Sequence, residues 1–225
     1  MERRYQRPGF VLNGPDLTFT VHNLHMMTLF EHPGSSNCYK IRLMFALLGV
    51  DYACVTFEHA KSHNRSSEFL KQNPRGLVPV LEAEGNYIWD STAILVYLAR
   101  RFDGESWLSV DGLAMSRVMQ WLALSQSEIL HGLMAARHII LGKRRGVLED
   151  AQGLGRVALG VLEDRLQRNN WLASEGPTIA DIACYPHVSR APESGIPLDA
   201  YPAMRRWIAR VEELPGWVPW TPRAG

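Results

Sequence analysis

Pro79 lies in the apolar run Leu77–Leu81, where the pattern of side chains predicts that a β-strand begins. Proline has no backbone N–H to donate to a sheet, so it is tolerated only at strand starts, sheet edges and bulges. The residue before it, Val78, is restricted to an extended backbone. Its N–H and C=O can therefore pair with an extended peptide that lies alongside, and the segment predicts a strand that begins beside a ligand.

Two polar residues follow this strand at the start of a helix. The turn-forming residues Glu84, Gly85 and Asn86 predict a hairpin to a second short strand, after which Asp90 and Ser91 precede a helical pattern of apolar residues. The first N–H groups of a helix have no partner within the helix. A carboxylate and a hydroxyl at that place therefore predict a polar binding pocket.

This arrangement resembles the glutathione-binding half of the soluble glutathione S-transferases, in a bacterial-like, serine-type form. Residues Thr28–Arg42 are similar to that family's first strand, catalytic turn and first helix. Residues Pro177–Ala183 are similar to a helix start in its all-helical half, where Thr178 and Asp181 predict a capping box. The three segments occur in the family's order, and the resemblance covers roughly residues 26 to 218.

The order of patterns predicts an α/β domain followed by an all-α domain. We expect a flexible N-terminal extension at 1–25, a thioredoxin-like βαβαββα domain at 26–103, and a helical bundle at 112–225 that contributes the pocket for an electrophile. The predicted first helix spans Ser36–Leu48. In the bundle, a 3.6-residue period predicts two inward stripes, of which one includes Met115, Val118, Met119, Leu122, Ile129, Leu133 and Ile140, and the other Val147, Ala151, Leu154, Ala158, Val161 and Arg165.

The composition narrows the function. A formal net charge of +1 with no basic face argues against nucleic-acid binding. Three widely spaced cysteines without a C-x-x-C pair fit free thiols in a reducing, cytoplasmic compartment, and the histidines lack the spacing of a metal site. No apolar stretch has the length of a membrane span, and the first 25 residues have no signal-peptide core.

Ser35 is the first candidate for catalysis, and Ser36 the second. Ser35 precedes the first helix, where free N–H groups and the helix dipole favour a thiolate. The alternative for Ser35 is a hydroxyl that only caps the helix. Cys38 occupies the second position of a C-x-x-C-like motif in which Ser35 occupies the first, so it is either a buried structural cysteine or the thiol of a thiol transferase.

The resemblance implies the other contacts to glutathione, the cosubstrate. Asp90 is expected to hold the γ-glutamyl ammonium, Ser91 its carboxylate, and the Val78 backbone the cysteinyl part, beside a cis Val78–Pro79 bond. Arg65 is expected to face the glycyl carboxylate, for which a guanidinium is well suited. Asn37 lies near the thiol. These residues follow from the family's pattern and not from spacing alone.

The function implied is conjugation of the glutathione thiolate to a small apolar electrophile, as in detoxification. The helix carrying Leu122, Ser125, Gln126, Ile129 and Met134 is expected to line the electrophile pocket. The alternatives are a glutathione-dependent isomerase, a thiol transferase, and a noncatalytic glutathione-binding or regulatory protein of the same fold. The resemblance also implies a homodimer with no metal, no nucleic acid and no membrane partner.

Overall fold

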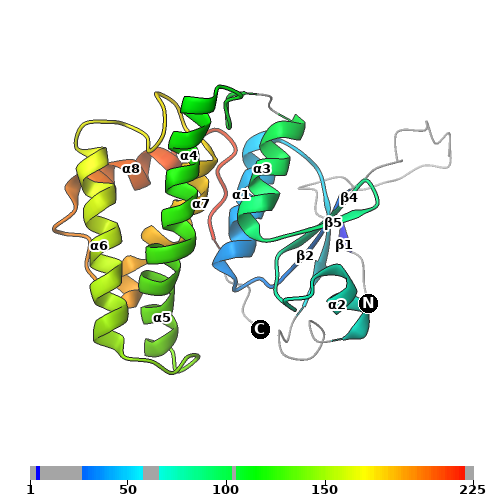
Figure 1. The fold of residues 1–225 in the computed structure, drawn as a ribbon, viewed down its shortest axis with the longest axis horizontal. Helices are drawn as coiled ribbons and strands as arrows, with labels where there is room; N and C mark the ends of the chain where they lie inside the picture. The colour runs from blue at the N-terminus through cyan, green and yellow to red at the C-terminus, as the bar shows by residue number, and fades with distance from the viewer. Residues whose placement is uncertain (1–3, 6–26, 58–65, 103–104, 221–225) are drawn as a thin grey trace, which may run out of the picture.

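The computed structural model describes residues 4–5, 27–57, 66–102 and 105–220. A small sheet with its helices lies beside an all-helical part (Figure 1). The helices α1 (Ser36–Leu48) and α3 (Ser91–Phe102) stand between the sheet and that second part. This architecture agrees with the predicted α/β domain followed by a helical bundle.

The sheet has five strands in the order β1-β3-β2-β4-β5. Their bounds are Arg4–Tyr5 for β1, Thr28–Glu31 for β2, Ala53–Thr56 for β3, Val80–Ala83 for β4 and Asn86–Trp89 for β5. Strands β2 and β3 are parallel, and the other pairs are antiparallel. With α1, α2 (Ser67–Gln72) and α3, the order from β2 onward is the predicted βαβαββα.

The N-terminal segment departs from the sequence prediction at two residues. Residues 1–25 were expected to form a flexible extension, but Arg4 and Tyr5 pair with Cys54 and Ala53 as strand β1. The physical reason is the edge of β3, whose backbone N–H and C=O groups would otherwise lack a strand partner. The rest of the extension lies outside the described residues.

The second part is built from helices that pack around one central rod. The rod comprises α4 (Gly112–Leu124), a π-helical segment η1 (Ser125–Met134) and α5 (Ala135–Ile140). Around it lie α6 (Leu148–Leu166), α7 (Ile179–Val188), the short η2 (Ala191–Ser194) and α8 (Pro202–Glu212). Segments η1 and α6 approach closely, because a Cβ added to Gly132 would overlap the backbone nitrogen of Gly155.

One hydrophobic core joins the two parts. It includes Leu29 and Leu81 from the sheet, Phe45 from α1, and Ile182 from α7, each of which is almost completely buried. Because apolar burial is the main favourable term in folding, a core that runs through both parts holds them in a fixed relation.

A lysine is buried in this interface. Lys40 of α1 has no exposed surface, and its Nζ donates to Ser125 Oγ of η1 at 3.3 Å, while that hydroxyl donates to the Ala183 carbonyl oxygen at 2.9 Å. Burial lowers the pKa of Lys40 from 10.5 to about 8. Burial disfavours the charged form of a lysine, and among the described residues no carboxylate forms an ion pair with Lys40 that would offset this.

Replacing Lys40 by methionine is expected to stabilise the protein at pH 7 by about 1 to 3 kcal/mol, because the charged amine no longer has to be desolvated on folding. The folded pKa lies below the unfolded one. The unfolded chain therefore binds more protons between pH 8 and 10.5, and the wild type gains stability as the pH rises through that window. The advantage of Lys40→Met should accordingly vanish toward pH 10.5.

Denaturant unfolding of both proteins across this pH range measures the difference. Lys71 of α2 is exposed and provides the control, since Lys71→Met should show no such trend. A Lys40→Met variant that is less stable than the wild type at pH 7 would show that the buried ammonium is a net stabilising group.

The chain after α8 turns back toward the first domain and passes between α1 and the helices of the second part (Figure 1, red). Gly216 has φ +89°, and a Cβ there would lie 2.6 Å from the Ala46 carbonyl oxygen of α1. The Tyr39 hydroxyl donates to the Val218 carbonyl oxygen at 2.7 Å. This C-terminal segment thereby brings Trp220 to the N-terminal end of α1.

Candidate active site

The strand register brings the predicted site residues to one edge of the sheet. Phe30 of β2 faces Val80 of β4, and Val80 faces Trp89 of β5. The end of β2, the start of β4 and the end of β5 therefore lie side by side. The turn that holds Ser35, the Val78–Pro79 segment and Asp90 continue from these three points and converge there.

Ser35 is the N-cap of α1. Its backbone is extended, its N–H donates to the His32 carbonyl oxygen at 3.0 Å, and its Oγ accepts from the Cys38 N–H at 3.3 Å. The hydroxyl therefore caps the helix, as the alternative reading proposed. A hydroxyl can accept one hydrogen bond and donate another, so capping does not prevent Ser35 from donating to a thiolate. Ser36 and Asn37 are, like Ser35, half-buried.

Cys38 is completely buried one turn into α1. Burial raises its pKa from 9.0 to about 12, and its Sγ accepts a hydrogen bond from the His32 N–H at 3.5 Å. At neutral pH this group is a thiol rather than a thiolate, and the thiolate is the reactive form of cysteine. The geometry therefore favours the structural reading of Cys38 over the thiol-transferase reading.

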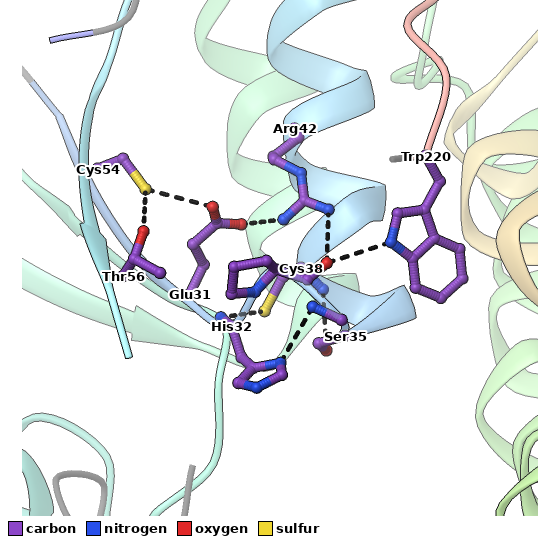
Figure 2. A network of polar contacts seen from close by, with 10 residues as sticks. Glu31, His32, Ser35, Cys38, Arg42, Cys54, Thr56 and Trp220 are labelled. Carbon is purple, nitrogen blue, oxygen red and sulfur yellow. Dashed lines mark hydrogen bonds and ion pairs between the residues drawn. The ribbon is translucent and has the colours of Figure 1, made fainter. Parts of the chain in front are cut away.

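The turn at residues 32–37, called here the catalytic turn, is held by a polar network (Figure 2). The Pro33 carbonyl oxygen accepts from Arg42 Nη2 at 3.2 Å and from Trp220 Nε1 at 3.1 Å. Arg42 also pairs with Glu31, and Cys54 Sγ donates to the same carboxylate at 3.3 Å. A strand, a helix and the C-terminal segment thus fix the position of the turn together.

The Val78–Pro79 peptide bond is cis, as predicted. The segment before it is shaped by Asn73, whose Nδ2 donates to the Leu77 carbonyl oxygen at 2.7 Å and whose Oδ1 accepts from the Arg75 N–H at 3.0 Å. Asn73 is buried, so these bonds are shielded from water. They hold the chain that leads into the proline.

Asp90 has a left-handed backbone, with φ +79°, in which aspartate is among the few tolerated residues. Its Oδ1 accepts from the Thr92 N–H at 2.8 Å and from Gln126 Nε2 at 3.2 Å. Its Oδ2 lies 3.4 Å from Nη1 of Arg75. The sequence had identified the carboxylate, but it had missed Arg75 and had assigned Gln126 to the electrophile pocket. A spatial partner such as Gln126, 36 positions away, leaves no local signal of its contact with Asp90.

Ser91 begins α3 and is buried. Among the residues that the structure describes, no hydrogen-bond partner reaches its Oγ. Buried hydroxyls normally have a partner, so an unused one beside Asp90 marks a place where a polar ligand group would be accommodated.

The second domain also contacts the catalytic turn at Asn37. Its Oδ1 lies 3.3 Å from Nε2 of His187, which is buried in α7. Burial lowers the pKa of His187 well below 6.5, so the ring is neutral at pH 7 and can donate to the amide oxygen. Sequence reasoning placed Asn37 near the thiol but did not find this partner.

Arg65 lies outside the described residues, so its expected contact stays a prediction. The expected electrophile pocket is wrong for Leu122, Ser125 and Ile129, each of which is at most 2% exposed. They pack into the core shared by the two domains, because α4 and η1 turn that face toward α7 and α1. Gln126 and Met134 keep partial exposure.

Comparison with known proteins gives two family matches in order along the chain. The model described as "Glutathione S-transferase, N-terminal domain" matches residues 25–100, and "Glutathione S-transferase, C-terminal domain" matches residues 125–215. The two matches cover both the sheet-containing part and most of the helical part.

Individual relatives agree with these matches. A maleylacetoacetate isomerase from Pseudomonas aeruginosa is 30% identical over 188 residues, covering 80% of this chain and 88% of the relative. The disulfide-bond oxidoreductase YfcG from Escherichia coli is 28% identical over 200 residues, covering 84% of this chain and 92% of the relative. A crystal structure of a glutathione S-transferase from Pseudomonas fluorescens superposes with a TM-score of 0.81 at 35% identity. The match covers 87% of this chain and 98% of that chain.

The part of the chain that the structure describes holds neither a candidate metal site nor a helix that could span a membrane. No cluster of three or more histidine, cysteine, aspartate or glutamate side chains is placed to bind a metal ion. In the same part of the chain, no helix has both the length and the apolar character required to cross a bilayer.

Proposed function

Because the chain belongs to the glutathione S-transferase family, we propose that it activates the thiol of its cosubstrate glutathione at Ser35 and transfers it to a small electrophile. The observation that carries this proposal is the convergence of the Ser35 turn, the cis Val78–Pro79 bond and Asp90 at one edge of the sheet. The domain at 26–103 would bind glutathione, and the domain at 112–225 would supply the electrophile site.

Each end of the tripeptide has a proposed contact. Asp90 would bind the γ-glutamyl ammonium and Ser91 the adjacent carboxylate, while the extended backbone of Val78 would pair with the cysteinyl part. Arg65 would face the glycyl carboxylate. The bonds from Gln126 and Thr92 to Asp90 Oδ1 support this role, since they hold the carboxylate in place and leave Oδ2 toward Arg75 and the ligand.

The helix start would then activate the thiol. The partial charge at the N-terminus of α1 stabilises an anion by about 0.3 to 2 kcal/mol, and one charge-assisted hydrogen bond from Ser35 adds about 1.5 to 3 kcal/mol. Together they would lower the thiol pKa of bound glutathione from about 8.5 to about 7. A useful thiolate fraction would then exist at neutral pH. Ser36 is the second candidate for this donor.

Two alternative glutathione-dependent reactions are supported by the names of similar proteins. A glutathione-dependent isomerisation is suggested by the maleylacetoacetate isomerase, and thiol transfer by the disulfide-bond oxidoreductase. Both use the same bound thiolate as conjugation. The burial of Cys38 argues against a mechanism in which the protein's own cysteine attacks, so isomerisation is the stronger alternative.

Retention on immobilised glutathione together with turnover of glutathione and an aryl halide tests the proposal. Binding with conjugation is the expected result. Binding without any turnover would identify a noncatalytic glutathione-binding protein, and no binding at all would reject the proposed site.

The three cysteines Cys38, Cys54 and Cys184 are free, which supports a reducing, cytoplasmic location.

We further propose that the protein is a homodimer. Apolar residues remain exposed on both parts, among them Trp89 on β5 and Leu113 and Met119 on α4. Exposed apolar surface of this kind often marks an interface. Light scattering at micromolar concentration should give twice the 25.4 kDa mass of one chain, whereas the mass of one chain would exclude the dimer.

A further inference from the structure

The second domain brings an excess of positive charge to the catalytic turn. Four side chains contribute it and are called here the basic cluster: Arg137 of α5, Lys143 and Arg144 of the loop that follows α5, and Arg190 after α7. The loop folds back on the helix, because the N–H groups of Lys143 and Arg144 both donate to the His138 carbonyl oxygen.

The charges of this cluster reach both ends of the turn. At His32, burial lowers the pKa below 6.5, and the nearby Lys143 lowers it further. At His187, which contacts Asn37, burial is again the main cause of the lowered pKa, followed by Lys40 and His138, and then by Arg137 and Arg190 in the same direction. Both histidines are thus neutral at pH 7, and both lie in a positive field.

The two arginines of the cluster are fixed beside the turn through Trp220. The guanidinium of Arg190 lies 3.7 Å from the centre of the Trp220 ring, and Trp220 donates to the Pro33 carbonyl oxygen at 3.1 Å. The guanidinium of Arg137 lies 5.6 Å from the same ring. The Trp220 ring therefore lies between Arg190 and the catalytic turn, and it contacts the turn at Pro33, two residues before Ser35.

The positive charge is only partly compensated. Glu193 pairs with both arginines, at 2.5 Å from Arg137 and 2.6 Å from Arg190. Glu31, the carboxylate nearest the turn in sequence, is already paired with Arg42. Within the described residues, no ion pair neutralises Lys143 or Arg144, and Arg190 Nε is buried without a hydrogen-bond partner. Glu193 thus neutralises only one of the two arginine charges that it contacts, and the net positive charge of the cluster favours a bound anion.

We propose that the basic cluster binds a carboxylate of the electrophile, so that the substrates combine an apolar body with an anionic group. The half-buried arginines would supply forked donors that match a carboxylate, and the exposed Lys143 and Arg144 would attract the anion from solution. The claim that the bound anion reacts with the thiolate rests on the proposed function. The claim that an anion binds to the basic cluster is independent of it.

A matched pair of unreactive ligands tests the anion site directly. 3,5-Dinitrobenzoate and 1,3-dinitrobenzene differ only by a carboxylate, and calorimetry at low salt with saturating glutathione should show about 10-fold tighter binding of the benzoate. Arg190→Gln should remove most of this preference, and so should a Lys143→Gln, Arg144→Gln double variant, which alters only an exposed loop. Arg156→Gln, on the exposed side of α6, is the control and should keep it.

Several outcomes would overturn the proposal. One is equal affinity for the two ligands in the wild type, and another is a preference that survives in both cluster variants. A third is a loss of glutathione affinity in those variants, which would assign the cluster to the cosubstrate instead. High salt should weaken the preference, because exposed charges are screened.

Turnover separates this proposal from the proposed function. 4-Chloro-3,5-dinitrobenzoate and 2-chloro-1,3-dinitrobenzene again differ only by a carboxylate; in both, the thiolate forms a C–S bond and chloride leaves with the C–Cl electron pair. After division by the uncatalysed rates, kcat/KM should favour the benzoate about 10-fold, and the ratio should fall toward one in Arg190→Gln. If neither halide reacts, the proposed transferase function is rejected. The difference in affinity between the two unreactive ligands then tests the anion site by itself.

Discussion

Ser35→Ala should lower the turnover of glutathione conjugation by roughly 10- to 100-fold, which corresponds to about 1.4 to 2.8 kcal/mol of transition-state stabilisation. The variant loses the hydrogen bond to the developing thiolate and one cap of α1. Glutathione binding should be largely retained, because Asp90, Ser91 and the Val78 backbone hold the other parts of the tripeptide. Turnover and the ultraviolet absorbance of the bound thiolate as a function of pH measure the two effects separately.

Cys38→Ser is the matched comparison and should change turnover little. Its side chain is completely buried, and serine is nearly isosteric with it. If the protein acted through its own cysteine, the two variants would exchange phenotypes, with Cys38→Ser inactive and Ser35→Ala active. A bound thiol that titrates identically in Ser35→Ala and the wild type would remove Ser35 from the mechanism, and Ser36→Ala would then be the next variant to examine.

The first domain was largely predictable because its signals are local. The helix at Ser36–Leu48 begins after a serine that caps it and ends before Gly49, which adopts φ +64°. Pro79 and Asp90 likewise mark their positions by backbone chemistry alone. Strand β1 was missed because two residues, Arg4 and Tyr5, carry no alternation, and their pairing depends on a partner strand far along the chain.

Periodicity was less accurate in the second domain. Met119 and Ile140 belong to the first predicted inward stripe, yet each is 48% exposed; Val147 and Val161 of the second are exposed as well. A 3.6-residue period assumes a continuous α-helix, but residues 125–134 form a π-helix, whose i to i+5 bonds take up an extra residue per turn. The buried face therefore shifts along the rod, and Ile140, beyond the π-helix, turns outward. Met119 of α4 and Val147 and Val161 of the α6 region lie outside the π-helix, which does not explain their exposure.

The residues of the candidate site also fall into those that local sequence signals reveal and those that they do not. Ser35, Val78 and Asp90 were identified from local signals, namely a helix start for Ser35 and Asp90 and a following proline for Val78, and the family resemblance supplied their roles. Gln126, Trp220 and Arg190 reach the same place from the second domain and carry no local mark of doing so. Contacts between domains depend on how the core packs, and the sequence alone did not reveal that the C-terminal segment crosses α1.

Asp181→Ala is expected to destabilise the protein by about 3 to 5 kcal/mol. Asp181 is completely buried at the start of α7 and forms the predicted capping box with Thr178. Its Oδ1 accepts from Leu172 N–H at 3.1 Å and from Trp207 Nε1 at 2.9 Å, and its Oδ2 accepts from Thr178 N–H at 2.9 Å. Alanine would leave these three buried donors unsatisfied, and each costs about 1 to 3 kcal/mol.

Asp111→Ala supplies the comparison that isolates burial from capping. Asp111 caps α4 through one bond, from Ala114 N–H to its Oδ1 at 2.8 Å, and it is exposed to solvent. Water can replace the lost acceptor there, so the expected loss is about 1 kcal/mol. Thermal and guanidinium unfolding at one protein concentration should therefore separate the two variants clearly. Equal losses would show that Asp181 acts only as a cap, and that its bonds to Leu172 and Trp207 add nothing to the stability of the helical domain.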